Sequence, residues 1–583
     1  MRIKTKYFET FKTLFYLLDK NSQKESVKSL IYILISAFLD IFSIATIIPL
    51  ILLVLNPEIA SQNRYFISII SFLNISTINF IRFLLVFIVL FFIVKNLLNI
   101  KISEFIAKYT YKIVTEISEK ALIKFYISDF QDIANKSSSI IIREIFEAPV
   151  DYSYQIIRSI INIFSELIVF FIIIIVVIFV NFKIAILLIL IYIPLMYLFY
   201  FIKRKKVAEI AQTNKITHNE ILKILYNSVK GFTDIRLFNK QSYFIKKYLK
   251  NNHSYQKIRS KTFVILEIPR RAVEIIIVLM LILLVVFGKY YIDNNNSLNI
   301  LISTVIAISY KLLPSLNKTY MNIIKVKTAW YSVEIVKELN NNSIENATGT
   351  ENENLKFKKS IKLKNFNFSY NDTNQQVFKN LNFDVEKGDF IGIIGKSGSG
   401  KTSLLNILSG LIIQDNILKI DDKFLSIKNV KNWYKQIGYV TQNSYIFNGS
   451  ICENIALGIK KSEINHNKLN DVLALVELDF WAKSLPNGKN TILGENGSKI
   501  SEGQKQRLAL ARVLYKKTDL LLLDEITGNL DFETEDSIIK LLEKLNKEGK
   551  TIIFVSHRKN TLKNCNKIFK IENYKLNNYE YQL

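Results

Sequence analysis

The sequence predicts a membrane α-helical domain followed by a soluble α/β domain that carries a phosphate-binding loop. Three observations predict this fold class. Apolar runs near the length of a membrane-spanning helix fill the first half of the chain. A polar stretch rich in Asn, Thr, Ser and Glu, residues 340–354, then interrupts the pattern as a linker would. Beyond it, short apolar strands alternate with amphipathic helices and glycine turns. We therefore divide the chain into a membrane domain (1–339), a linker (340–354) and a soluble domain (355–583).

Composition narrows the function classes before any motif is considered. Half of the 583 residues are hydrophobic, which excludes a disordered chain. Only two cysteines are present, which excludes a disulfide scaffold and fits a reducing compartment. The formal net charge of +27 fits either a nucleic-acid-binding protein or a membrane protein with basic cytosolic loops. The distribution of the basic residues decides between these two classes.

Six apolar runs are predicted to cross the membrane, since a helix needs about 20 mostly apolar residues to span the hydrocarbon core. They are residues 29–55, 80–100, 158–180, 184–202, 272–292 and 298–313. The third is the clearest, because 167–180 includes no polar residue, and the sixth is the weakest, because Ser, Thr and Tyr interrupt it. A large soluble helical core is the alternative, but several runs lack any polar face.

The basic residues near the spans predict the orientation. With both termini inside, the three outer loops carry only Arg64, Lys183 and Lys289 as basic residues. The inner side carries the basic cluster 203–206 and many further Lys and Arg residues, as the positive-inside rule requires. Both termini and the soluble domain are therefore expected in the cytosol, and no nucleic-acid partner is expected. The long inner connections, 101–157 and 203–271, are expected to extend the membrane helices into the cytosol.

Two further segments carry expectations of their own. The first 28 residues are basic and amphipathic without a cleavage site, which favours a leading helix at the cytosolic interface over a signal peptide. The outer segment 64–73 is either a short helix on the outer membrane face or a plain connector.

A glycine-rich motif follows the predicted strand 390–394 and opens the predicted helix 403–408. It matches the P-loop pattern and consists of Gly395, Lys396, Ser397, Gly398, Ser399, Gly400, Lys401 and Thr402. The glycines let backbone N–H groups wrap phosphates, and the helix N-terminus adds a positive dipole end. Lys401 is expected to reach the β- and γ-phosphates of ATP, and Thr402 to ligate Mg²⁺.

A second apolar strand, 520–523, ends in two carboxylates. Asp524, at the end of a buried strand beside a P-loop, is expected to hold Mg²⁺. Glu525 is the next residue, and its position predicts a general base that polarises the attacking water. The motif pair therefore predicts ATP hydrolysis with Mg²⁺ as cofactor.

Residues 500–507 carry the most specific motif. The run Ile500-Ser501-Glu502-Gly503-Gln504, followed by Lys505-Gln506-Arg507, resembles the signature of the ATP-binding cassette (ABC) transporters, which is usually Leu-Ser-Gly-Gly-Gln. The chain as a whole resembles the exporter type, in which six transmembrane helices extended into the cytosol are fused to an α/β P-loop ABC ATPase domain. This resemblance implies a multi-pass protein of the bacterial cytoplasmic (inner) membrane.

The resemblance assigns roles to further positions of this sequence. Tyr370 matches the aromatic residue that stacks on adenine. Gln442 matches the glutamine that touches Mg²⁺ and senses the membrane domain. Asp531 matches the acid of the loop after the second strand, and His557 matches the histidine that senses the γ-phosphate. Ser501, Gly503 and Gln504 match signature residues that complete the ATP site of the opposite subunit, which implies a second identical subunit.

Three departures from the family pattern stand in this chain. Glu502 replaces the first signature glycine, 528–531 replaces the commoner Ser-Ala-Leu-Asp, and the glycine usual after the P-loop helix is absent around Asn416. An extra carboxylate near phosphates is unfavourable unless it points away. Because the other ATP-site residues are retained, hydrolysis is expected to survive, and a homodimer with two competent sites is the simplest interpretation.

Ionisable residues in or beside the spans suggest where a substrate passes, since such residues are costly in a membrane. They are Asp40, Lys95, Glu166, Glu274 and Lys311. They either line a polar path or pair with one another. Asp40, the patches 95–99 and 310–315, and the segment 64–73 resemble the lipid-linked oligosaccharide flippase of bacterial N-glycosylation.

This resemblance predicts ATP-driven translocation of a polyprenyl-diphosphate-linked oligosaccharide to the outer leaflet. Export of another amphiphile, such as a lipid, drug or peptide, is the alternative. Coupling to the ATPase is expected at the tips of the inner helices, near 126–130 and 230–238.

Overall fold

The computed structural model describes residues 19–55, 77–180, 216–291, 314–339, 355–370, 376–528, 531–556 and 558–579, with scattered positions from 182 to 213 and Leu312. The chain separates into two compact units. The first comprises Met1–Tyr126 and Lys136–Asn341, and the second comprises Ile127–Asn135 and Asn342–Leu583. The short stretch Ile127–Asn135, which we predicted within the membrane domain, thus groups with the soluble domain.

The described part of the first unit has helices joined by short turns and no strand. Its elements are α2 (Lys20–Leu55), α5 (Thr77–Ile127), α7 (Ser138–Ile142), η1 (Arg143–Glu147), α8 (Ala148–Asp151), η2 (Tyr152–Ile157), α9 (Arg158–Val180), α11 (Phe232–Leu237), α12 (Gln241–Tyr291) and α14 (Trp330–Glu338). Helices α5 and α12 have 51 residues each. At about 1.5 Å per residue each is about 75 Å long, more than twice the thickness of a bilayer core. Both helices therefore extend well beyond a membrane, as the sequence predicts.

The predicted spans fall on these helices wherever the structure describes them. Residues 29–55, 80–100 and 158–180 lie in α2, α5 and α9, and 272–291 lie in α12. The predicted spans 184–202 and 298–313 fall almost entirely outside the described residues, as do the segment 64–73 and the linker 340–354. In the part of the chain that is described, Arg82–Ile127 and Ser138–Ile175 are long and apolar enough to cross a membrane.

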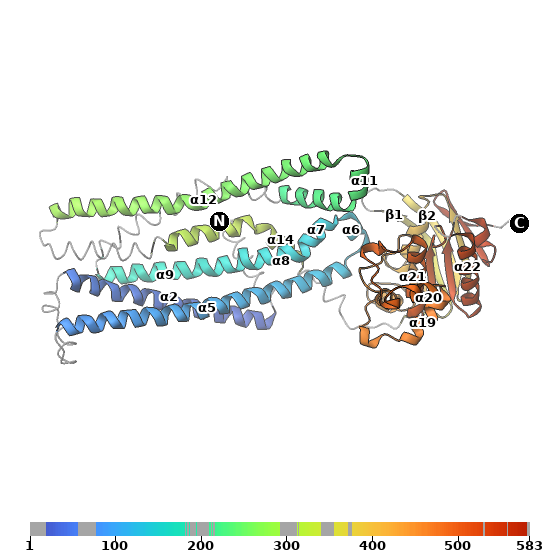
Figure 1. The fold of residues 1–583 in the computed structure, drawn as a ribbon, viewed down its shortest axis with the longest axis horizontal. Helices are drawn as coiled ribbons and strands as arrows, with labels where there is room; N and C mark the ends of the chain where they lie inside the picture. The colour runs from blue at the N-terminus through green and yellow to red at the C-terminus, as the bar shows by residue number, and fades with distance from the viewer. Residues whose placement is uncertain are drawn as a thin grey trace. The chain divides into compact units, whose positions relative to one another are not determined.

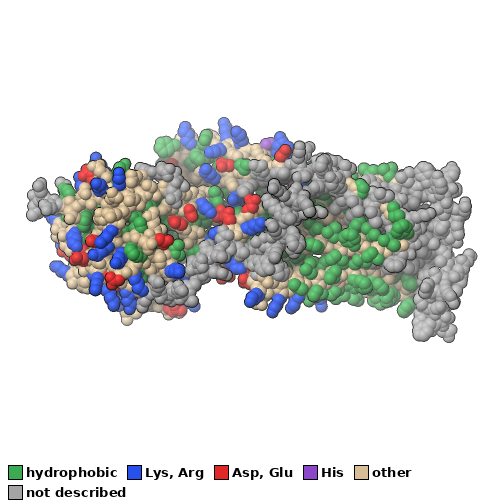
Figure 2. All heavy atoms as spheres, turned by 180° about the vertical axis from the view of Figure 1, so that it is seen from behind, with side chains coloured by type: hydrophobic (Ala, Val, Ile, Leu, Met, Phe, Trp, Pro, Cys, Tyr) green, Lys and Arg blue, Asp and Glu red, His purple; other side chains and the backbone are tan. Residues whose placement is uncertain are grey.

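The helical unit leaves apolar side chains uncovered where a bilayer would surround it. On α5, Val86, Leu90, Val94 and Leu97 are each more than half exposed. Figure 2 shows a broad apolar surface on this unit. Part of the core lies beyond the predicted spans, where Ile113 of α5 packs with residues of η2 and α14. An uncovered apolar surface of this kind is typical of a lipid-facing helix bundle.

Two π-helical turns, η1 and η2, interrupt the long helix that runs from α7 to α9. Pro149 lies between them at the start of α8. A proline removes one backbone donor and crowds the preceding turn, so a local change in helical winding at this place has a physical cause.

The second unit contains two sheets. It also includes α6 (Phe130–Asn135), which is separated in sequence from the rest of the unit. The strands are β1 (Ser360–Ser369), β2 (Gln376–Glu386), β3 (Phe390–Gly395), β4 (Leu418–Ile420), β5 (Lys423–Phe424), β6 (Ile437–Val440), β7 (Leu520–Asp524), β8 (Thr551–Val555), β9 (Lys567–Glu572) and β10 (Lys575–Asn578). The helices are α16 (Lys401–Ser409), α17 (Val430–Tyr434), α18 (Ile451–Ile455), η3 (Lys461–Glu463), α19 (His466–Leu475), α20 (Asp479–Ser484), η4 (Gly488–Asn490), η5 (Glu495–Gly497), α21 (Glu502–Lys516), α22 (Phe532–Lys547) and η6 (Lys559–Leu562). Figure 1 shows these elements in chain order by colour.

The larger sheet has the strand order β10-β9-β3-β8-β7-β6, and β9, β3, β8, β7 and β6 run parallel. The smaller sheet, β2-β1-β4-β5, is antiparallel. Alternate residues of β7 enter two different cores: Leu521 and Leu523 pack in one, and Leu520 and Leu522 in the other. A strand buried on both faces needs an unbroken apolar run, which is what 520–523 provides. The carboxyl ends of the parallel strands share one edge, where ligands bind in such sheets.

Candidate ATP site

The P-loop connects β3 to α16 and is shaped by its glycines. Gly398 and Gly400 have φ angles of +78° and +104°, which L side chains rarely adopt. A Cβ on Gly395 would lie 2.5 Å from the Oγ of Ser399 and 3.1 Å from the carbonyl oxygen of Ile571. A Cβ on Gly400 would lie 2.8 Å from a methyl carbon of Val377. The loop therefore keeps its curvature only with glycine at these positions.

Lys401 begins α16, and its side chain folds back over the loop. Its Nζ donates to the carbonyl oxygens of Gly395, at 3.0 Å, and Lys396, at 3.1 Å. The same Nζ lies 3.9 Å from Oε1 of Glu525. Burial lowers the pKa of Lys401, while Glu525 and Asp524 act in the opposite direction. The ammonium thus stands at the mouth of the loop, where the phosphates of ATP would replace weaker carbonyl partners.

The hydroxyl of Thr402 and the carboxylate of Asp524 are held together. Oγ1 of Thr402 donates to Oδ2 of Asp524 at 2.8 Å, and Asp524 is buried at the end of β7. A hydroxyl beside a buried carboxylate offers the hard oxygen ligands that Mg²⁺ prefers, with phosphate oxygens left to supply the rest. The residues present therefore fit Mg²⁺. The buried Oγ of Ser399 has no hydrogen-bond partner among the described residues, which fits a loop built to meet phosphate oxygens.

Glu525 is positioned between two of the other predicted site residues. Nε2 of Gln442 donates to its Oε2 at 2.8 Å, while Lys401 lies on the side of Oε1. The backbone N–H of Glu525 donates to Val555 of the neighbouring strand at 3.1 Å. Its side chain keeps a fifth of its surface exposed, at 21%. The carboxylate is thus fixed in direction yet open to water, as a general base must be.

Tyr370 lies beside the P-loop helix. Its hydroxyl shares a hydrogen bond of 2.8 Å with the Oγ of Ser403, the residue after Thr402. Its ring meets Phe368 edge to face, with 5.0 Å between centroids. The predicted adenine-stacking ring is therefore anchored next to the phosphate loop. Ser403 was not among the predicted residues, and only its place directly after the P-loop could have indicated it.

Two parts of the sequence match known families. Residues 378–528 match the family described as "ABC transporter", and residues 155–312 match the "ABC transporter transmembrane region". A solved structure titled "Structure of a bacterial Atm1-family ABC exporter with ATP bound" has a TM-score of 0.78 at 18% identity, covering 96% of this chain and 95% of that one. This likeness gives the fold of the whole chain. The chain is an ABC transporter with the exporter-type fold.

Curated proteins similar to this ABC transporter include two described as "ATP-dependent lipid A-core flippase". That of Pasteurella multocida (strain Pm70) is 32% identical over 47% of this chain and 46% of its own length. That of Francisella tularensis subsp. holarctica (strain OSU18) is 28% identical over 64% of this chain and 62% of its own length. The "Alpha-hemolysin translocation ATP-binding protein HlyB" of Escherichia coli O157:H7 is 34% identical over 42% of this chain and 34% of its own length. Each match spans less than two thirds of the relative.

The signature of this ABC transporter begins helix α21. Ser501 is the N-cap, and its Oγ accepts from the N–H of Gln504 at 3.3 Å. The side chain of Gln504 accepts in return from the N–H of Ser501 at 3.0 Å, which completes a capping box. Gly503 lies in the same first turn. The three predicted signature residues are therefore held at one helix end.

Glu502, the unusual residue of the signature, has a local partner. It stands in the first turn of α21, where a negative charge is favourable by about 0.5 kcal/mol. Its Oε2 lies 3.1 Å from Nζ of Lys505. The carboxylate thus has a cationic partner on its own helix, which reduces the repulsion expected between Glu502 and phosphates.

Asp531 caps helix α22. Its carboxylate accepts from the N–H of Thr534 at 3.1 Å and from the Thr534 hydroxyl at 2.8 Å. These hydrogen bonds lower the pKa of Asp531. His557 lies outside the described residues, and so does Asn529. Strand β8, which precedes His557, ends at Val555 between β3 and β7.

Arg512 was not singled out from the sequence, although it shapes the segment after Gln442. Its guanidinium donates to the carbonyl oxygens of Asn454, at 2.8 Å, and Tyr445, at 3.1 Å. Burial lowers its pKa. No sequence pattern distinguishes this arginine from its neighbours, since its partners are backbone carbonyls more than fifty residues away.

The charged residues of the predicted spans are paired where they are described. Lys95 of α5 lies 2.8 Å from Asp40 of α2, donates to Ser43 at 3.0 Å and is buried. Glu166 of α9 lies 3.5 Å from Lys318. Glu274 lies 3.3 Å from both Arg270 and Arg271 on its own helix. Lys311 lies outside the described residues. Pairing explains why these charges are tolerated, and their role in a substrate path stays a prediction.

Proposed function

We propose that two identical copies of this chain form an ATP-driven flippase in the bacterial cytoplasmic (inner) membrane, with both termini and the ATPase domain in the cytosol. Its substrate would be a polyprenyl-diphosphate-linked oligosaccharide, moved from the inner to the outer leaflet. The observation that carries the enzymatic part is the Glu525 carboxylate held by Gln442, next to Lys401 and the Thr402–Asp524 pair.

Each of these residues has a step in ATP hydrolysis. Lys401 neutralises charge on the β- and γ-phosphates, and Tyr370 positions the adenine. Thr402 and Asp524 would hold Mg²⁺, with Gln442 beside them, and the ion would neutralise charge on the phosphate oxygens. Glu525 accepts a proton from the attacking water, while Gln442 fixes the direction of that carboxylate. His557 is assigned to contact with the γ-phosphate on the resemblance alone.

A second copy is proposed because one chain holds each motif once. The start of α21 is formed by Ser501, Gly503 and Gln504. Its N–H groups can donate to the γ-phosphate of ATP bound at the P-loop of the opposite subunit. Asp531 stands at the start of α22, where it would influence the contact between the two ATPase domains. Two copies provide two complete sites.

The substrate proposal rests on two kinds of support. The patches around Asp40, Lys95 and Lys311 resemble a flippase of lipid-linked oligosaccharides. Two relatives are described as lipid A-core flippases, proteins named for another glycolipid. Export of a different amphiphile is the second candidate, and the similarity to a hemolysin translocation protein favours a polypeptide among these.

Reconstitution in lipid vesicles tests the proposal. The purified protein is mixed with fluorescent lipid-linked oligosaccharide, and protection of the fluorophore is followed with and without ATP. ATP-dependent protection in the wild type and none in E525Q is expected. Transport of lipid A or a peptide without movement of the oligosaccharide would refute the proposed substrate and leave the ATPase assignment standing. Lys311→Ala should slow flipping more than ATP hydrolysis if Lys311 lines the path, and an equal loss of both would indicate a structural role.

A further inference from the structure

A pocket separate from the ATP site lies in the ATPase domain, at the edge of the main sheet opposite to the P-loop. Its volume is about 570 Å³, within the range of small-molecule sites. Thr518 and Lys550, which line it, stand just before β7 and β8, whereas the ATP site follows the other ends of these strands. Five residues of strand separate the two edges by about 17 Å. The pocket is therefore distinct from the ATP site.

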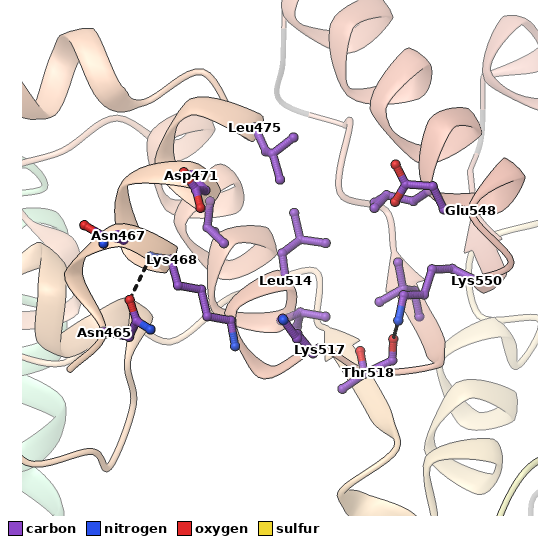
Figure 3. Close-up of a pocket in the computed structure, with 14 residues that line it drawn as sticks. Asn465, Asn467, Lys468, Asp471, Leu475, Leu514, Lys517, Thr518, Glu548 and Lys550 are labelled. Atoms are coloured by element: carbon purple, nitrogen blue, oxygen red, sulfur yellow. Dashed lines mark hydrogen bonds between the residues drawn. The ribbon is translucent and has the colours of Figure 1, made fainter. Parts of the chain in front are cut away.

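The walls of this pocket are of three kinds. Apolar side chains of α19, α21 and α22 form the floor, with Val472, Val513 and Leu545 buried. Leu475 and Leu514 reach into the space in Figure 3. Polar side chains also line the pocket, and they are Asn465, Asn467, Lys468, Asp471, Lys517, the buried Thr518, Glu548 and Lys550.

Among the described residues, two of the lysines have no carboxylate counter-ion, and Nζ of one of them, Lys468, lies over the ring of Tyr515, 4.7 Å from its centroid. Figure 3 shows Lys468 of α19 and Lys517 on the same side of the pocket. Neither forms an ion pair with a carboxylate among the described residues, whereas Lys550 lies 3.6 Å from Asp519 and donates to the Thr518 carbonyl. Burial lowers the pKa of Lys468, and the positive charge of Lys517 lowers it further. An anion between these two ammonium groups would relieve their repulsion.

Lys517 is also an unexpected residue at its position. It is the C-cap of α21 with φ +59° and ψ +61°, a left-handed conformation that usually falls to Gly or Asn. A lysine there gives up about 1 kcal/mol of backbone energy. A favourable interaction with the helix C-terminus offsets part of this, but it does not require the side chain to lie in the pocket wall. The side chain of Thr518, the next residue, is buried, and in the described part of the chain its Oγ1 has no hydrogen-bond partner.

We propose that this pocket binds a small organic phosphate. The phosphate group lies between Lys468 and Lys517, which are suited to it as point charges. The carbon skeleton lies against Leu475 and Leu514. Ligand hydroxyl groups donate to the carboxylates of Asp471 and Glu548 on the rim. The site is independent of the proposed transport function, because none of the described residues that line it belongs to the ATP site or to a predicted span.

Titration calorimetry of the full-length protein in lipid nanodiscs tests this site, with glucose 6-phosphate as the probe. Saturable binding of one molecule per chain is expected. K468Q and K517N should each weaken it about tenfold or more, since each removes one charge-assisted contact. Asparagine tolerates the left-handed backbone at 517, so K517N should fold, and K468Q provides a second test away from that turn.

The controls separate this site from others. K460Q removes an exposed lysine outside the pocket and should leave binding unchanged, and K401A should do the same because it alters only the ATP site. Glucose should not bind, and inorganic phosphate should bind more weakly than glucose 6-phosphate. Absence of saturable binding, or unchanged binding in both K468Q and K517N, would overturn the proposal. Equal affinity for inorganic phosphate would overturn the role assigned to the leucine wall.

Discussion

Replacing Glu525 by glutamine tests the chemistry of the ATP site most directly. The substitution keeps the shape of the side chain, and its remaining amide oxygen can still accept from Nε2 of Gln442, now 2.8 Å from Oε2. The lost property is the negative charge that can take a proton from water. The contacts of Thr402 with Asp524 and of Lys401 with the loop carbonyls do not involve this carboxylate. ATP binding should therefore survive while hydrolysis fails.

The expected loss follows from the usual contribution of a general base. Such a group accelerates proton transfer by about 100- to 10,000-fold, which corresponds to about 2.7–5.5 kcal/mol of transition-state stabilisation. The fold should be unaffected, because the buried Lys401 keeps its hydrogen bonds to the carbonyl oxygens of Gly395 and Lys396 when the 3.9 Å contact with Glu525 is lost.

The assay compares ATP turnover of wild type and E525Q in nanodiscs, with nucleotide binding measured by calorimetry on the same samples. Q442A provides the matched control for positioning. It should reduce turnover less than E525Q, since Glu525 keeps its charge and its Lys401 contact but loses its fixed direction. An E525Q protein that hydrolyses ATP at the wild-type rate would refute Glu525 as the base. Loss of ATP binding in E525Q would show that the carboxylate serves the loop instead.

Three further perturbations have defined outcomes. D40A leaves the buried ammonium of Lys95 without its 2.8 Å partner and should destabilise the protein by about 3 kcal/mol in denaturant unfolding; the double variant D40A/K95M should recover stability, and no recovery would contradict the pairing. S501A removes an N-cap. It should lower the free energy of unfolding by about 1 kcal/mol and reduce the rate of ATP turnover, whereas S501T should retain the cap. The hydrogen bond to Glu147 raises the pKa of His218. This pair therefore stabilises the fold below the unfolded value of about 6.5 and loses its effect as pH rises through the higher folded value. H218Q should lower the thermal unfolding temperature more at about pH 6 than at about pH 8.5, and a constant difference would exclude the charged pair.

The ATPase part of the fold was predictable because its signals are local. The P-loop requires glycines at positions where a Cβ would collide or φ is positive, so the requirement is written in consecutive residues. The apolar run 520–523 predicts a strand buried on both faces, and the structure places it between two cores. The membrane spans are similarly local, since twenty apolar residues suffice to cross a bilayer.

The pairing of distant side chains was not predictable in the same way. The sequence left two interpretations for Asp40 and Lys95, a polar lining or a mutual pair, because hydropathy says nothing about which helix faces are adjacent. The structure brings the two together across α2 and α5. The Gln442–Glu525 hydrogen bond and the contacts of Arg512 likewise join residues more than fifty positions apart.

The sequence by itself thus determined the two-part architecture, the identity of the phosphate loop and the candidate base, because each depends on neighbouring residues that share a strand, a turn or a helix. Only the tertiary structure decided which charges neutralise one another and which do not. Glu502 forms an ion pair with Lys505 on its own helix, whereas Lys468 and Lys517 line one pocket without a carboxylate partner among the described residues. The physical reason is that an ion pair forms within about 4 Å in space, and separation along the chain does not specify that distance.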